Sequence, residues 1–175
     1  MSAEALAKSF LDYAATKLRD HFAQIRRCTS LLGEEQAWLR PNASSNSTAN
    51  LLLHLAGNVR QWIVGGIGGR PVERDRQAEF DRDGGATRQE LIAALGSVVD
   101  EACAVLAGMD GADLLRHYRI QAYDVTGIAA VMHVVEHFSF HTGQIVTATK
   151  WLLDVDLSLY DEHGHRRDGR AEDIP

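Results

Sequence analysis

The sequence predicts an all-α protein, a four-helix bundle whose helices are joined by long connections. Only three prolines occur in 175 residues, so long stretches contain no helix breaker. Four segments repeat apolar residues at three- and four-residue steps, which is the period of one helix face. We expect one bundle domain over residues 1–160, followed by a polar, flexible tail over residues 161–175.

The first two helices are expected on either side of a polar loop. The first covers residues 3–32, and the loop over 33–45 contains proline, asparagine and several serines. Ser47 or Thr48 can cap the second helix, which ends in the glycines of residues 65–69. The inward face of the first helix is expected to carry its large apolar residues: Leu6, Phe10, Tyr13, Leu18, Phe22, Ile25 and Leu32.

The second half of the chain supplies two more helices. Residues 66–86 form a long polar connection, and a connection of this length in a compact domain is usually functional or mobile. Thr87 then caps a third helix, with Glu90 as the partner in a capping box. Residues 114–125 are compatible with an extended segment or a short helical turn. The fourth helix is expected over residues 127–153.

Charge and composition exclude several classes of protein. The net charge is −6, the pI is about 5.7 and no basic stripe occurs, so we expect no nucleic-acid partner. No apolar run approaches the roughly 18 residues of a membrane helix, and the N-terminus lacks the apolar centre of a signal peptide. Cys28 and Cys103 are interpreted as packing residues of a cytoplasmic protein. The tryptophans are expected to be core or loop anchors: Trp38, Trp62 and Trp151.

Three histidines of the fourth expected helix carry the most information about function. His133, His137 and His141 follow one another at four-residue steps, so neighbours share a helix face about 6 Å apart. Two adjacent imidazoles can reach one metal ion, but the outer two lie about 12 Å apart along the axis. A metal site here would therefore use an adjacent pair and take a third ligand from another helix.

His54 is the candidate for that third ligand. It lies among leucines on the second helix, where an unpaired imidazole would cost about 1 to 3 kcal/mol. Asn58 and Gln61 follow on the same face and continue a polar stripe. A hydrogen-bonded core histidine is the alternative, and the spacing alone leaves both roles open. The remaining histidines are interpreted as exposed or structural: His21, His117, His163 and His165.

Two segments of the chain resemble motifs of a known family. HVVEHFSFHTGQI, on the fourth helix, is similar to a signature of the DinB-like (DinB/YfiT) superfamily of four-helix bundles. NLLLHLAGNVRQWI is similar to the second-helix motif of that superfamily, and the resemblance is to a subgroup of unknown function. It implies a nickel or zinc ion held by His54, His137 and His141. His133 then lies outside the ligand set, behind the ligands or in the packing.

The resemblance also implies a homodimer and an open position on the metal ion. The better-understood relatives are transferases and isomerases that use small bacterial thiols such as mycothiol or bacillithiol. The relatives that use mycothiol often have an acid among the metal ligands. In this chain, all three matched positions are histidine.

Three functions are therefore weighed. The first is transfer of a small thiol at the metal ion, with Asn58, Gln61 and Gln144 able to orient a substrate. The second is hydrolysis by metal-bound water, which lacks an obvious general base because Glu136 lies about 100° from His137 around the helix. The third is a non-enzymatic, stress-related bundle in which the metal ion is structural or sensory.

Overall fold

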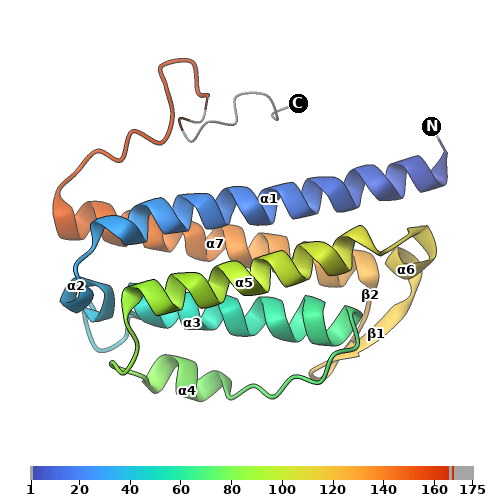
Figure 1. Ribbon diagram of the computed structural model, residues 1–175, viewed down its shortest axis with the longest axis horizontal. Helices are drawn as coiled ribbons and strands as arrows, with labels where there is room; N and C mark the ends of the chain where they lie inside the picture. The colour runs from blue at the N-terminus through green and yellow to red at the C-terminus, as the bar shows by residue number, and fades with distance from the viewer. Residues whose placement is uncertain (1, 166, 168–175) are drawn as a thin grey trace.

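Four long helices lie side by side and form the bundle that the sequence predicts (Figure 1). The computed structural model describes residues 2–165 and 167. The second of the four helices continues directly into a π-helix, η1. The bounds of these elements are α1 Ala3–Leu31, α3 Thr48–Val59, η1 Arg60–Ile67, α5 Arg88–Ala107 and α7 Gly127–Leu153.

Side-chain caps explain where the long helices begin. Ser47, Thr87 and Thr126 each accept a hydrogen bond from the backbone N–H three residues later, which satisfies one free donor of the first turn. Ser47 and Thr87 belong to full capping boxes, the latter with Glu90 as expected. The starts of α3, α5 and α7 therefore agree with the sequence prediction.

The connections contain short elements that the sequence analysis did not predict. Residues 33–45 include helix α2 (Glu34–Trp38), and the polar connection of 66–86 includes helix α4 (Arg76–Asp81). The sequence analysis missed these two helices because helices of one or two turns have no apolar periodicity to reveal them. Asp75 caps α4 through its side chain.

Residues 114–125 contain both structures that the sequence left open. Helix α6 (Gly111–Leu115) is followed by an antiparallel hairpin of β1 (His117–Ile120) and β2 (Tyr123–Thr126), with Ile120 opposite Tyr123. The hairpin packs on η1, where a Cβ at Gly66 would come within 2.6 Å of Ile120 Cγ1. The glycine at the end of the second helix is therefore needed for close approach of the hairpin.

The core lies where α1, α3, α5 and α7 meet, and its largest fully buried side chains include Phe138, Leu18, Ile25 and Leu52. The inward face of α1 differs in part from the prediction. Leu6 and Tyr13 are exposed, and the buried positions of the first half are Ala7, Leu11, Ala14, Ala15 and Leu18. The prediction gave weight to large side chains, whereas alanines allow α1 to approach its neighbours closely.

The chain after α7 returns along the bundle toward α1 (Figure 1). Leu157 is buried, and its carbonyl accepts a hydrogen bond of 2.6 Å from Arg27. Of the tail expected at 161–175, residues 166 and 168–175 lie outside the described residues. Within the described part of the chain, no helix is both long and apolar enough to span a bilayer.

Candidate metal centre

The bundle brings together one histidine of α3 and two of α7. His54 Nε2 lies 3.0 Å from His137 Nε2, which in turn lies 3.2 Å from His141 Nε2. Nitrogen ligands of a tetrahedral zinc ion, at 2.0–2.1 Å from the metal, are about 3.3 Å from one another. Two of the three nitrogen pairs therefore have the spacing of ligands on one ion, and all three ligand atoms lie within 4.8 Å of one another. They form the single candidate metal-ligating group among the described residues.

Hydrogen bonds on the far side of two rings fix which nitrogen carries the proton. His54 Nδ1 lies 2.9 Å from the carboxylate of Glu79 and, at a longer 3.2 Å, from Arg74 Nη2, and the shorter contact makes it the donor to Glu79. His141 Nδ1 donates to the side-chain oxygen of Gln144 at 2.7 Å. In both rings Nε2 is then the unprotonated nitrogen, with its lone pair directed at His137. A partner on the other nitrogen is the usual arrangement of a metal-binding histidine.

The electrostatics of the site keep the histidines of α7 neutral. Burial, reinforced by His141, His54, His133 and Arg74, lowers the pKa of His137 to about 3. Burial also lowers the pKa of His141, against the hydrogen bond with Gln144. Neutral imidazole is the form that binds a metal ion. His137 Nδ1 is buried and has no hydrogen-bond partner among the described residues.

These observations together test whether a divalent transition metal fits. Of the three converging Nε2 atoms, only that of His137 can carry a proton, because the other two rings carry theirs on Nδ1. One proton cannot make hydrogen bonds among all three nitrogens, so a cation suits the set better. Three neutral nitrogen donors favour zinc, nickel or copper over magnesium or calcium. The residues therefore fit such an ion.

A buried ion pair from the 66–86 connection supports His54. Arg74 donates to both oxygens of Glu79, from Nε at 2.6 Å and from Nη2 at 2.8 Å, and its Nη1 donates to Gln61 at 2.9 Å. The side chains of Arg74 and Glu79 are 5% and 11% exposed. Burial would raise the pKa of Glu79, but hydrogen bonds from Arg74 and His54 outweigh it and hold that pKa below its usual value.

The sequence analysis missed Arg74 and Glu79. The only signal was the length and polarity of the connection, which do not tell one charged residue of the segment from another. Gln61, a residue of the polar stripe named in the sequence analysis, accepts hydrogen bonds from Arg74 and Gln121.

A cavity of about 580 Å³ opens beside the histidines, and His54 and His137 form part of its wall. His133 lies in the wall against Trp62, with ring centroids 4.1 Å apart and ring planes tilted by 35°. Asn58 Nδ2 lies 3.4 Å from His133 Nε2, while Asn58 Oδ1 is buried and has no partner among the described residues. The volume is within the usual range for small-molecule sites.

The other singled-out residues lie away from this centre. His117 pairs with Asp124 on the surface of the hairpin, and Glu136 is exposed. Cys28 and Cys103 are buried free thiols, as expected, and burial raises the pKa of both. The expectation for Trp151 as a core or loop anchor was wrong, because its side chain is exposed at the end of α7.

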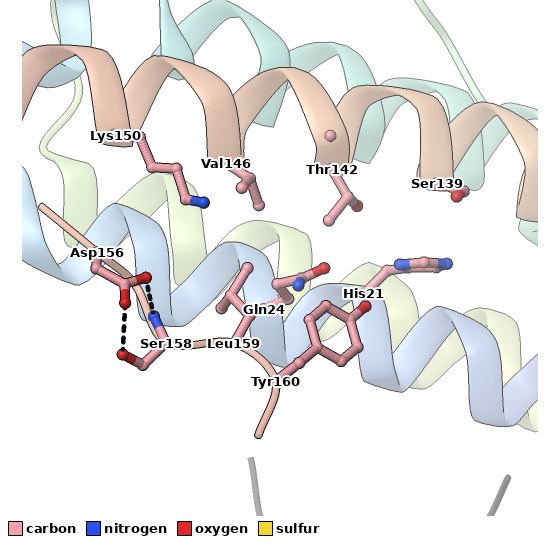
Figure 2. A pocket seen from close by; sticks show the side chains of 11 residues that line it. His21, Gln24, Ser139, Thr142, Val146, Lys150, Asp156, Ser158, Leu159 and Tyr160 are labelled. Atoms are coloured by element: carbon pink, nitrogen blue, oxygen red, sulfur yellow. Dashed lines mark hydrogen bonds between the residues drawn. The ribbon is translucent and has the colours of Figure 1, made fainter. Parts of the chain in front are cut away.

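A second hollow, of about 550 Å³, lies on the opposite face of α7, between that helix and α1 (Figure 2). Thr142 and Lys150 of α7, Gln24 of α1 and Tyr160 of the following segment line it (Figure 2). Its only hydrogen bonds between lining residues in Figure 2 join Asp156 to Ser158. No group of three metal-ligating side chains converges there among the described residues.

Comparison with known proteins agrees with this fold and site. The model of a family described as Mycothiol-S-transferase matches residues 14–147, which is more than half of the chain. A comparison with curated proteins finds no match.

Several solved structures share the fold. A DinB-like protein from Bacillus subtilis, YjoA, has a TM-score of 0.63 at 16% identity, over 83% of this chain and 95% of that one. A DinB-like protein from Bacillus cereus has a TM-score of 0.61 at 13% identity, over 75% and 85%. A conserved protein from Enterococcus faecalis has a TM-score of 0.61 at 16% identity, over 89% and 99%. The DinB-like fold expected from the sequence motifs is thereby confirmed.

Proposed function

Because the chain belongs to the mycothiol-S-transferase family, we propose that it joins the sulfur of mycothiol to an electrophilic substrate at a metal ion held by His54, His137 and His141. The observation that carries the proposal is the convergence of the three Nε2 atoms at 3.0 and 3.2 Å. We propose nickel or zinc as the ion. The acidic ligand that relatives using mycothiol often have is replaced here by a third histidine, so the site keeps more positive charge.

The chemistry needs a thiolate, which the charge of the site favours. A divalent ion with three neutral ligands would bind a thiolate and lower the pKa of the incoming thiol. The new bond joins that sulfur to the electrophilic carbon, and the electron pair passes to the leaving group or to the conjugated system of the acceptor. The thiol proton passes to solvent before attack, and the product of an addition to a conjugated acceptor takes a proton from solvent, so the chain needs no separate strong base.

The cavity beside the ion is proposed to hold the electrophile. Trp62, Val125 and the ring of Tyr123 give it an apolar wall. Asn58 also lines the cavity, and its amide is proposed to hydrogen-bond a polar group of the substrate. Binding there would orient the substrate toward the histidines, which is what a transfer between two small molecules requires.

Metal-dependent hydrolysis has less support. A hydrolase needs a general base beside the metal-bound water. Glu136 is exposed on α7, and the carboxylate of Glu79 already accepts hydrogen bonds from Arg74 and His54. A purely structural metal ion would not need the adjoining cavity of about 580 Å³.

The implied homodimer and cytoplasmic location belong to the same proposal. An apolar hollow at the end of the bundle is lined by Leu6, Phe10, Leu115 and Ile128, and most of these side chains are exposed. Exposed apolar patches of this kind commonly bind another protein. Two buried, unpaired cysteines suit a reducing compartment. Sedimentation analysis tests the dimer, and a monomer at micromolar concentration would contradict it.

Cobalt substitution gives a direct test of thiol binding at the site. We expect mycothiol to produce a thiolate-to-cobalt charge-transfer band with the Co²⁺-loaded protein, because cobalt occupies zinc sites and reports its ligands by absorption. S-methyl mycothiol, which cannot supply a thiolate, is the matched control and should give no band. Absence of the band with mycothiol and with bacillithiol would overturn the thiol-transfer proposal.

A further inference from the structure

We propose that Glu79, clamped by Arg74, is the positioning residue that sets His54 for metal binding, so that the 66–86 connection is part of the metal centre. The inference rests on the proposed metal binding and goes beyond it. It concerns a carboxylate that approaches His54 from the side away from the other two histidines.

The first step of the argument is the orientation of the His54 ring. A half-turn of an imidazole about its Cβ–Cγ bond puts Cδ2 in the place of Nδ1 and Cε1 in the place of Nε2, at little cost in packing. The Glu79 carboxylate only accepts hydrogen bonds, so its contact of 2.9 Å places the proton on Nδ1. Arg74 Nη2 lies 3.2 Å from the same nitrogen and can only donate, but its shorter hydrogen bond of 2.8 Å to Glu79 is compatible with this tautomer. With that proton fixed, Nε2 is left as the donor atom toward His137. A carboxylate in this place also makes the imidazole a stronger ligand.

The second step is what holds Glu79. Arg74 contacts both of its oxygens in a two-pronged arrangement, and the two side chains are almost fully buried. A buried ion pair is weak evidence for stability, because the desolvation cost offsets the attraction. Its geometric specificity is the property that a positioning role would use. The burial of the Arg74–Glu79 pair therefore indicates a role in positioning His54 rather than in stabilising the fold.

The third step is the surface on which the pair rests. Gly57 lies three residues after His54 on α3, and a Cβ there would overlap Glu79 Oε1 and lie 2.7 Å from Arg74 Nε. The absence of a side chain at 57 lets the ion pair lie directly against the helix. The ion pair therefore contacts α3 within one turn of His54.

The backbone of α4 is itself tied to the bundle. Asn50, fully buried in the first turn of α3, donates from Nδ2 to the carbonyls of Glu79 at 3.0 Å and Arg82 at 2.7 Å. Arg40 donates to the carbonyl of Phe80. These bonds hold the short helix against α3, so Glu79 approaches His54 from a fixed element.

Glu79→Gln tests the proposal by removing the charge while keeping an acceptor of the same size. We expect metal affinity, measured by competition with a chromophoric chelator, to fall 10- to 100-fold, roughly the range for partners behind metal ligands. Glu136→Gln removes an exposed charge next to His137 in sequence and should change the affinity less than twofold. Imidazole nitrogen NMR of metal-free protein should show His54 protonated at Nδ1 in the wild type and mixed in Glu79→Gln.

A second variant is needed because Glu79→Gln leaves the buried charge of Arg74 without a counter-ion and could unfold the protein. Gly57→Ala keeps both charges but displaces the pair, and we expect at least a tenfold loss of metal affinity. Gly143→Ala, on α7 with open space around its Cβ, is the matched control and should keep wild-type affinity. Unchanged affinity in folded Glu79→Gln or Gly57→Ala would overturn the positioning role. Failure of the wild type to bind metal would overturn the proposed function instead, and it is seen without any variant.

Discussion

Helix α7 is flanked by two hollows of nearly equal size, about 580 Å³ toward α3 and the hairpin and about 550 Å³ toward α1. Toward α3, three imidazoles converge and a buried ion pair fixes one of them. Toward α1, polar side chains line the hollow without converging (Figure 2). The two hollows therefore do not differ in size. They differ in whether their side chains bring metal-binding atoms together.

Three polar side chains of the α1 side, those of Thr142, Asp156 and Ser158, form hydrogen bonds within their own segments. Thr142 Oγ1 donates to the carbonyl of Phe138 one turn earlier, and Asp156 accepts from the backbone and hydroxyl of Ser158. On the α3 side, Asn58 Oδ1 and His137 Nδ1 have no partner among the described residues. Unsatisfied buried atoms are costly, and they are expected where a ligand completes the set.

The largest expected difference between the two faces is in stabilisation by metal. Zinc at roughly 100 times its Kd should stabilise the wild-type protein by about 2.7 kcal/mol, because only the folded chain assembles the site. His141→Ala should lose this effect, whereas Ser139→Ala on the opposite face should retain it. Thermal melts with and without zinc measure the shift, and an equal shift in both variants would contradict the assignment of the site.

A smaller difference is expected in substrate binding. Asn58 and Gln24 are both amides that line a hollow, 4% and 9% exposed respectively. Asn58→Leu should raise the KM for the electrophile roughly fivefold, since a hydrogen bond contributes about 1 kcal/mol. Gln24→Leu is the matched substitution on the α1 side and should leave kcat and KM unchanged. Steady-state kinetics decide, and a larger effect of Gln24→Leu would place the substrate in the other hollow.

The smallest expected effect comes from the exposed surface of α7. Gly143→Ala should stabilise the metal-free protein by about 0.5–1 kcal/mol, because alanine loses less backbone entropy in a helix and its Cβ would meet no atom within 4 Å. Urea denaturation measures the gain. A destabilised variant would show that this surface has a contact that the isolated chain lacks, such as a dimer interface.

Much of the bundle could be predicted from the sequence because its signals are local. Thr87 with Glu90 marks the start of α5, and the four-residue steps of His137 and His141 place both on one side of α7. His54 is a candidate from its place among leucines, the resemblance to the DinB-like superfamily implies the same residue, and the structure brings it to the pair. Whether the three bind a metal ion is still a prediction.

The support of His54 could not be predicted in the same way. Glu79 reaches it across 25 positions of sequence, from a six-residue helix within a connection rich in charges. Composition and periodicity do not show which side chain of so short a helix faces the bundle. Leu6 and Tyr13 show a second limit, because three of the buried positions in the first half of α1 are alanines, to which a hydrophobic pattern gives little weight.

The central claim is that the α3 face of α7 holds a metal ion, and metal content measures it most directly. We expect mass spectrometry of protein purified without a histidine tag to find about one nickel or zinc ion per chain, and the variant with His137→Ala and His141→Ala to have none. A wild-type protein without metal, even after incubation with nickel or zinc, would contradict the claim. The three histidines would then be packing residues of a helical bundle.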